Sequence, residues 1–268
     1  MSAISGTSEA WLLVMERSKF TKAQSPARLS QVVTQFEEQM KNSHKEVVEN
    51  ADGSSFRAYV SEPTNPNGHA VIVLQEIFGV TAHIKRVADQ FAEDGFIAYA
   101  PDLFWRMHPG VELTHSEQDM QKAFSFLGQY KDEDGIKDIA QTVAHIRQRT
   151  GFTGKIAAVG LCLGGKLAYL ASTLPGIDAS VSFYGVGIEN CLDAAGAIRC
   201  PLMLHFGDQD PYVNDQVRQQ IMNALTSKAV QSHLYPGANH GFYTRGEPAD
   251  IDLARQRTNA FLKSVLNK

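Results

Sequence analysis

A cysteine, an aspartate and a histidine of this sequence stand in short motifs that could together carry out nucleophilic catalysis. Cys162 lies in GLCLGG, Asp210 in GDQDPY and His240 in GANHGF. A thiolate can attack an ester carbonyl, an imidazole can accept and return the proton, and a carboxylate can orient the imidazole and stabilise its charged form. Each residue alone has a plainer interpretation, because aspartates are common in turns and most histidines are structural or solvated.

Cys162 falls on a sharp turn between a predicted strand and a predicted helix. The apolar run 156–159 predicts a buried strand, and residues 163–174 predict a helix. Such a turn exposes its central side chain if the neighbouring residues are small, and the glycines of GLCLGG meet this need. The helix start also favours thiolate over thiol and offers N–H groups to an oxyanion. The alternative is a cysteine that is simply buried beside a glycine-rich helix start.

The loops that carry Asp210 and His240 each begin where a predicted strand stops. GDQDPY follows the strand 201–206, and GANHGF follows the strand 231–235. In a parallel sheet, active residues gather at the carboxyl ends of the strands. The chain order of cysteine, acid and histidine is also that of the α/β-hydrolase arrangement. Asp208, in the same loop, competes with Asp210 as the acid.

The remaining pattern predicts an α/β fold with a mostly parallel, twisted sheet covered by helices on both faces. Strands alternate with helices along the chain, and apolar runs such as 70–74 are typical of strands buried on both faces. The predicted strands are 46–48, 55–60, 70–74, 96–100, 156–159, 179–184, 201–206 and 231–235, and the predicted helices are 81–94, 134–149, 163–174, 214–226 and 250–266.

Two regions of the chain differ in pattern. Residues 1–44 form an N-terminal extension in which one amphipathic helix, beginning near Pro26, presents Leu29, Phe36 and Met40 on one face. This arm packs on the domain or a partner subunit, or it is a poorly ordered extension. Residues 45–268 contain no linker-like stretch, so we expect one large α/β-hydrolase domain.

Composition excludes several classes of function. The net charge is −4 with both signs interspersed, so no basic face indicates nucleic acid or an anionic membrane. The apolar run 11–15 is too short for a signal peptide, and no segment could span a bilayer. Three cysteines without a C-x-x-C motif or Cys/His cluster indicate a reducing cytoplasm and no metal site.

From about residue 45 to the C-terminus, the sequence resembles the dienelactone hydrolase family, also called carboxymethylenebutenolidases. The resemblance rests on QEIFG (75–79), APDLFWR (100–106), FYGVG (183–187) and HGF (240–242), together with the GLCLGG and GDQDPYV motifs. It implies hydrolysis of a cyclic enol-lactone bearing a carboxylate, which gives maleylacetate-type acids in the degradation of chlorinated aromatics. It implies neither a metal nor an organic cofactor.

The resemblance also assigns roles residue by residue. Family loops place the acid directly before the Pro-aromatic-Val segment, which favours Asp210 over Asp208. The implied set comprises the catalytic triad Cys162, Asp210 and His240, the oxyanion-hole amides of Leu163 and Ile77, the thiol-modulating Glu76, and Arg106, Phe78 and Tyr184 as substrate contacts.

Glu76, Arg106 and Arg245 each have more than one interpretation. A carboxylate beside a thiol could keep Cys162 protonated until a bound anion displaces it, although a solvated acid near a helix start is the alternative. For Arg106 the alternative is a surface salt bridge of little energetic value. The family can carry a second carboxylate-binding arginine four residues after the catalytic histidine. Here that position is Thr244, and Arg245 follows it.

The sequence therefore predicts a cysteine-dependent hydrolase of small carboxylated lactones or esters that acts as a monomer or a small homo-oligomer. A general carboxylesterase or thioesterase on the same scaffold is the second interpretation, because fold does not fix substrate. A binding protein that keeps an inactive hydrolase fold is the third, and the presence of all three triad residues argues against it.

Overall fold

The computed structural model of this chain describes residues 42–226 and 229–268. The amphipathic helix predicted in the N-terminal extension lies outside the described residues. From residue 42 onward, the described chain forms one compact unit, and this unit contains every predicted site residue.

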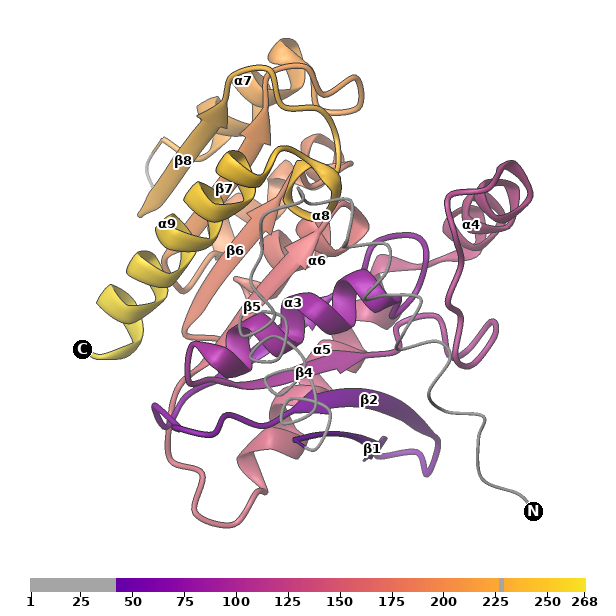
Figure 1. The fold of residues 1–268 in the computed structure, drawn as a ribbon, viewed down its shortest axis with the longest axis vertical. Coiled ribbons are helices and arrows are strands. Elements are labelled where there is room, and N and C mark those ends of the chain that lie inside the picture. Colours follow the sequence, from indigo (N-terminus) through magenta and orange to yellow (C-terminus); the bar gives the residue numbers. More distant parts are fainter. Residues whose placement is uncertain (1–41, 227–228) are drawn as a thin grey trace, which may run out of the picture. The chain divides into compact units, whose positions relative to one another are not determined.

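The core of this unit is an eight-stranded sheet in the order β1-β2-β4-β3-β5-β6-β7-β8 (Figure 1). β1 and β2 form an antiparallel hairpin at one edge, β2 pairs antiparallel with β4, and all other pairings are parallel. The strands are β1 (Ser43–Glu49), β2 (Ser55–Ser61), β3 (Ala70–Leu74), β4 (Ile97–Pro101), β5 (Ile156–Leu161), β6 (Ala179–Phe183), β7 (Leu202–Gly207) and β8 (Val230–Tyr235).

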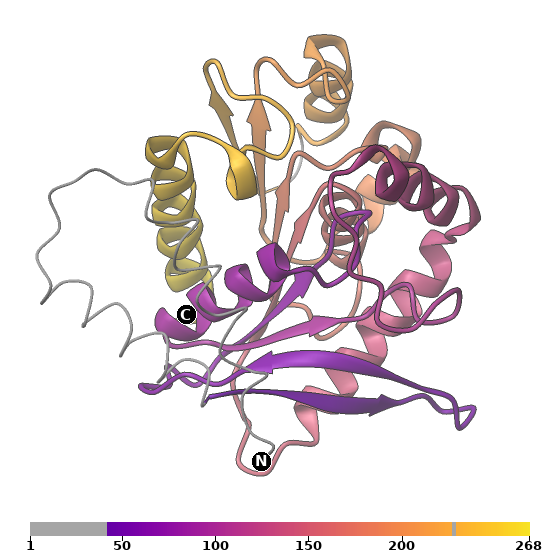
Figure 2. The ribbon, with the colours of Figure 1, turned by 45° about the vertical axis from the view of Figure 1, so that its right-hand side comes forward.

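Helices cover both faces of the sheet. They are α3 (Ala82–Glu93), α4 (Glu117–Gln129), α5 (Asp132–Arg147), α6 (Leu163–Ala171), α7 (Asp215–Ala224), α8 (Phe242–Arg245) and α9 (Pro248–Leu266), with the short 3₁₀ helices η1 (Ile188–Asn190) and η2 (Leu192–Ala197). Figure 2 shows α3 and α9 on one side of the sheet and α5 on the other.

Alternate residues of the central strands pack into the hydrophobic clusters on the two faces of the sheet. Val71 and Val73 of β3 pack in the cluster that includes residues of α3 and α9. Ile72 and Leu74 pack in the cluster that includes residues of α5 and α6. Because both faces are covered, all residues of β3, β5, β6 and β7 are buried, as the continuous apolar runs predict.

The predicted α/β-hydrolase fold is confirmed, and every predicted strand and helix of this unit appears within a few residues of its expected bounds. The helix α4 was not predicted. Ser116 caps it by accepting a hydrogen bond from the Asp119 amide, and Ala123 is its only buried residue. Within the described ranges, no helix has the length and apolar character needed to cross a membrane.

Candidate active site

Cys162 occupies a strained turn between β5 and α6. Its φ of 56° and ψ of −114° lie in a region that non-glycine residues rarely adopt. Glycines make the turn possible, because a Cβ at Gly160 would overlap the carbonyl of Gly164, and a Cβ at Gly164 would overlap that of Leu74. The close approach of β3, β5 and α6 therefore fixes the thiol at the carboxyl edge of the sheet.

His240 is held by Asp210. Asp210 is 2 % exposed, and its Oδ2 lies 2.7 Å from His240 Nδ1. The other oxygen, Oδ1, accepts hydrogen bonds from the amides of Tyr212 (2.8 Å) and Val213 (3.1 Å), so the carboxylate is fully engaged. Asp208 instead accepts from the Gly237 amide at 2.7 Å. Of the two candidate acids, Asp210 is thus the one that contacts the imidazole.

Cys162 and His240 line one pocket of about 360 Å³, a volume within the usual range of ligand sites. The helices α4, α6 and α8 and the loops that follow β3, β6, β7 and β8 contribute to it. The charged groups among its walls are Glu76, Lys166 and Arg245. The remaining lining residues are Ile77, Phe78, His115, Met120, Phe124, Leu127, Leu163, Val186, Gly187 and Tyr212. The structure therefore brings together most of the predicted site, including Glu76, Ile77, Phe78 and Leu163.

Glu76 is almost fully buried beside the thiol. Its side chain is 3 % exposed, and its Oε2 lies 3.2 Å from Nη1 of Arg245. Burial raises the pKa of Glu76, while the interactions with Arg245 and His240 act against that rise. The solvated-acid alternative for Glu76 is thereby excluded, because the carboxylate is not solvated.

The helix start does not make Cys162 a thiolate in this structure. Burial, followed by the negative charge of Glu76, raises the pKa of Cys162 to about 12. A hydrogen bond from the Leu163 amide and the charge of Arg245 favour the thiolate but are outweighed. The amide at the helix start thus acts in the predicted direction but is outweighed, and the thiol is protonated at neutral pH, as the interpretation of Glu76 as a thiol-modulating carboxylate predicts.

Leu163 and Ile77, whose backbone amides are the predicted oxyanion-hole donors, both line the pocket with Cys162. Leu163 begins α6, and Ile77 follows Glu76 in a turn that the Gly79 amide closes on the Glu76 carbonyl. Gly164 donates to the carbonyl of Gln75 at 2.9 Å, which ties the two backbone segments together. Across residues 42–226 and 229–268, neither the Leu163 nor the Ile77 amide has a backbone acceptor. The Leu163 amide hydrogen-bonds the Cys162 sulfur, and the oxyanion hole formed by the two amides stays a prediction.

Arg106 and Tyr184 do not line this pocket. Arg106 donates to Asp138 Oδ2 at 2.6 Å, and its guanidinium lies 4.3 Å from the centre of the Trp105 ring. Tyr184 is fully buried, with its ring edge-on to His240 at 4.9 Å. Tyr184 thus supports the imidazole, and Arg106 has a protein partner where a substrate contact was expected.

The pocket also contains residues that were not predicted from the sequence. Met120, Phe124 and Leu127 of α4 form an apolar wall, and Phe124 is half exposed. Their i, i+4, i+7 spacing after the Ser116 cap was an available helix signal. Lys166 of α6 and His115, before α4, lie in the same pocket without any motif that marks them.

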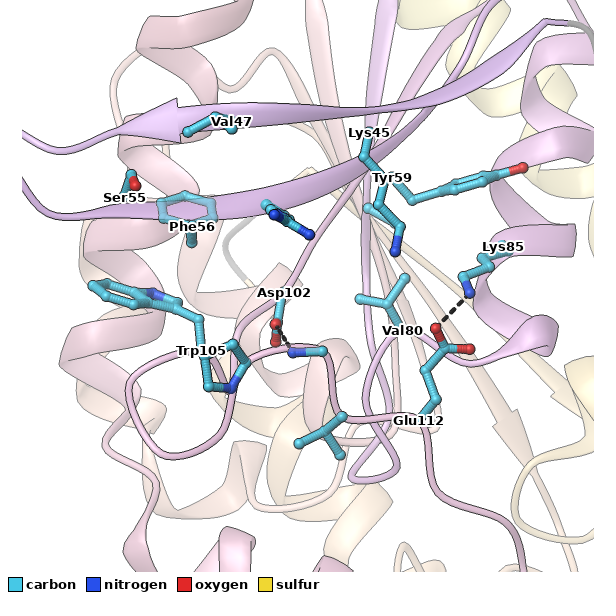
Figure 3. Close-up of a pocket in the computed structure, with 15 residues that line it drawn as sticks. Lys45, Val47, Ser55, Phe56, Tyr59, Val80, Lys85, Asp102, Trp105 and Glu112 are labelled. Carbon is cyan, nitrogen blue, oxygen red and sulfur yellow. Dashed lines mark hydrogen bonds and ion pairs between the residues drawn. The ribbon is translucent and has the colours of Figure 1, made fainter.

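A larger cavity of about 470 Å³ lies against the β1–β2 hairpin. Figure 3 shows Lys45 and Tyr59 of the hairpin above Asp102 and Trp105, with Lys85 paired to Glu112 at 2.6 Å. Its lining contains neither cysteine nor histidine. We therefore place the candidate chemistry in the smaller pocket.

One group of described residues has the composition of a metal site. Ligand atoms of His44, Glu46 and Glu62 lie within 4.8 Å of one another. Arg149 donates to Glu46 at 2.9 Å and to Glu62 at 2.7 Å, so a protein cation already pairs with both carboxylates. None of the three lines the Cys162 pocket, and the absence of a metal or organic cofactor from the mechanism stays a prediction.

Comparison with known proteins connects this geometry to a family. A model of the dienelactone hydrolase family matches residues 56–267. A carboxymethylenebutenolidase of Pseudomonas sp. (strain P51) is 35% identical over 218 residues, which cover 81% of this chain and 91% of that protein. A carboxymethylenebutenolidase of Pseudomonas putida is 32% identical over 227 residues, covering 82% of this chain and 96% of that protein.

A solved structure supports the fold. The dienelactone hydrolase-like promiscuous phosphotriesterase P91 from metagenomic libraries superposes with a TM-score of 0.68 at 19% identity, covering 84% of this chain and 99% of that chain. Since the family match spans most of the chain and the relatives align over most of their own length, this chain is a member of the dienelactone hydrolase family of α/β-hydrolases.

Proposed function

We propose that this protein hydrolyses small lactones or esters that carry a carboxylate, with Cys162 as the nucleophile. One observation carries the proposal, namely that a single pocket is lined by Cys162, His240 and Arg245. His240 is fixed by the buried carboxylate of Asp210, and Arg245 pairs with Glu76. The match to the dienelactone hydrolase family and the relatives named carboxymethylenebutenolidase support dienelactone as the substrate. Opening of its ring would give maleylacetate as the product.

Arg245 supplies the carboxylate site in this proposal. Its guanidinium lines the pocket and is 31% exposed, whereas Arg106 lies outside the lining and is paired with Asp138. A guanidinium can bind a carboxylate through two parallel hydrogen bonds. Arg245 therefore takes the role that the family gives to an arginine one position earlier in the chain.

Substrate binding then activates the thiol. A substrate carboxylate on Arg245 competes with Glu76 for the same cation and weakens the hold of Glu76 beside Cys162. Because the negative charge of Glu76 raises the pKa of Cys162, its displacement or protonation lowers that pKa. His240, held through Nδ1, can accept the thiol proton at Nε2. The resting thiol is thereby kept neutral and less reactive until substrate arrives.

The chemistry follows in two stages. The Cys162 thiolate attacks the lactone carbonyl carbon, and the oxyanion accepts hydrogen bonds from the amides of Leu163 and Ile77. The ring C–O bond breaks, and the imidazolium of His240 returns its proton to the leaving enol oxygen. Water, deprotonated by His240, then attacks the thioester, and the C–S bond breaks to release the acid and regenerate the thiol.

A matched pair of substrates tests this proposal. The kcat/KM of the enzyme is measured on dienelactone and on the same lactone with its carboxylate converted to the primary amide. We expect the carboxylate form to be preferred by about tenfold or more, because a hydrogen bond to a charged group is stronger than one to a neutral group. Equal rates would remove the proposed role of Arg245, and no hydrolysis of either lactone would remove the proposed activity.

A general carboxylesterase is the second candidate. The apolar wall of Phe78, Met120, Phe124 and Leu127 favours it, since such a surface would accept an uncharged acyl or alcohol group. In that case neutral aryl esters would be turned over at least as well as the carboxylated lactone. We also propose a cytoplasmic location, which the free thiols of Cys162, Cys191 and Cys200 support.

A further inference from the structure

A second cation lines the pocket on a different helix from Arg245. Lys166 lies one turn into α6, where its amide donates to the Cys162 carbonyl at 3.2 Å. Its side chain is 16% exposed. Its Nζ would be 3.8 Å from a Cβ placed on Gly187, which also lines the pocket. The ammonium group therefore belongs to the wall of the site and not to the outer surface.

The two cations are independent of each other. Arg245 pairs with Glu76, which follows β3, whereas Lys166 pairs at 2.7 Å with Asp132, the first residue of α5. Within residues 42–226 and 229–268, the two side chains have no hydrogen-bond or ion-pair partner in common. A single substrate carboxylate on Arg245 would leave Lys166 without a role in the proposed reaction.

The Lys166–Asp132 pair still leaves donors for a ligand. An ammonium group carries three N–H donors, and the ion pair with Asp132 engages one side of it. Asp132 lies in the first turn of α5, where a negative charge is favourable. Asp132 can therefore hold the ammonium group in place while the lysine binds a second anion from the pocket.

We propose that Lys166 binds a second anionic group, so that the preferred substrates of this enzyme are lactones or esters bearing two carboxylates. This inference rests on the proposed function, because it assumes that the first carboxylate occupies Arg245 and that the reacting carbonyl lies at Cys162. Lys166 is then a residue that determines specificity, and it takes no part in proton transfer.

The test uses a lactone that carries a second carboxylate as a ring carboxymethyl group, and the same compound with only that carboxylate converted to the primary amide. Wild-type enzyme should prefer the dianion. Lys166→Met should lower kcat/KM for the dianion by about 10- to 100-fold, mainly through KM, as expected for a lost hydrogen bond to a charged group. The kcat/KM for the monoanion should fall far less, because it never used that bond, so the ratio of the two values should drop by about tenfold or more.

Two further variants separate specificity from structure. Lys166→Arg keeps the charge and should restore most of the preference for the dianion. Lys137→Met removes a lysine of α5 that is 72% exposed and outside the pocket, so it should leave the ratio of the two rates unchanged. Retained turnover of the monoanion shows that each variant is folded.

The inference is overturned if wild-type enzyme prefers the monoanion, or if Lys166→Met slows both substrates equally. The first result leaves the proposed function intact, because the monoanion would still be hydrolysed at Cys162. The second would make the Lys166–Asp132 pair a structural link between α5 and α6. Failure of wild-type enzyme on both lactones would instead overturn the proposed function itself.

Discussion

Two arginines of this protein each pair with a buried carboxylate, yet their surroundings differ. Arg106 and Arg245 are 35% and 31% exposed, and their partners Asp138 and Glu76 are 0% and 3% exposed. Asp138 also accepts from the Trp105 indole at 3.0 Å. Among the described residues, the carboxylate of Glu76 accepts a side-chain hydrogen bond only from Arg245, and its charge acts on the Cys162 thiol.

This difference distinguishes a fixed ion pair from an exchangeable one. The Asp138 oxygen that faces Arg106 is held by two donors and lies away from the pocket, so opening that pair would leave a buried charge poorly compensated. The longer Glu76–Arg245 pair opens onto the pocket, where a substrate carboxylate can replace Glu76. A similar pairing of residue types thus supports the fold in one place and, we propose, chemistry in the other.

The largest expected effect comes from removing the reacting groups, Cys162 and His240, which lie beside the exchangeable Glu76–Arg245 pair. Cys162→Ala and His240→Ala should each lower kcat by roughly 10³-fold or more, because the members of such a unit act together. The double variant should lose little more than either single variant. Rates near that of wild type for Cys162→Ala would move the nucleophile elsewhere. Cys191→Ser is the control, since Cys191 does not line the pocket.

The next largest effect on kcat should come from Asp210 and not from Asp208, the other aspartate of the GDQDPY loop. Asp210→Asn removes the charge that orients His240 and should lower kcat by at least about tenfold, though less than loss of the nucleophile. Asp208→Asn changes contacts to the Gly237 amide and the Gln209 side chain, and none to the imidazole, so its effect should be mild. Steady-state kinetics on both variants decide the matter, and a larger loss for Asp208→Asn would contradict the assigned orientation of His240.

The Arg106–Asp138 pair should contribute to the thermal stability of the protein. Arg106→Met removes one of two donors to buried Asp138 and should cost about 1.5–3 kcal/mol, which lowers Tm by roughly 4–10 °C for a protein of this size. Lys122→Met, which breaks an exposed pair on α4, should change Tm little. Thermal unfolding measures both. An unchanged Tm for Arg106→Met would mean that this pair is no more structural than a surface contact.

The smallest effect concerns the resting thiol. Glu76→Gln removes a negative charge that raises the pKa of Cys162, so that pKa should fall and alkylation of Cys162 should accelerate at pH 8. Each unit by which the pKa falls raises the thiolate fraction about tenfold. The rate of iodoacetamide labelling at Cys162 is followed against pH. An identical pH profile in the variant would show that Glu76 does not control the thiol.

The strands and most helices could be predicted because burial on both faces leaves continuous apolar runs such as Ala70–Leu74. The elbow was equally visible, since only small residues permit the turn at Cys162. The helix α4 was missed because it buries little: Ala123 is its one buried residue, and its other apolar side chains face a pocket that only the folded chain creates.

Contacts distant in sequence could not be predicted. Arg106 finds Asp138 across 32 positions, and Arg245 finds Glu76 across 169. A motif gives the position of an arginine in the sequence, but it does not show which carboxylate pairs with that arginine in the folded chain. The balance at Cys162 could not be predicted for the same reason: the opposing influences of the helix start and of Glu76 were both expected, but which prevails depends on burial in the folded chain.

The central claim is that Arg245, and not Arg106, selects the substrate carboxylate. The decisive measurement is the ratio of kcat/KM for dienelactone to that for its primary amide, in wild type, Arg245→Met and Arg106→Met. The ratio cancels any change in the thiol that affects both substrates. We predict that Arg245→Met lowers it about 10- to 150-fold, since a hydrogen bond to a charged group is lost, and that Arg106→Met leaves it unchanged. A ratio lowered by Arg106→Met and unaffected by Arg245→Met would contradict this account.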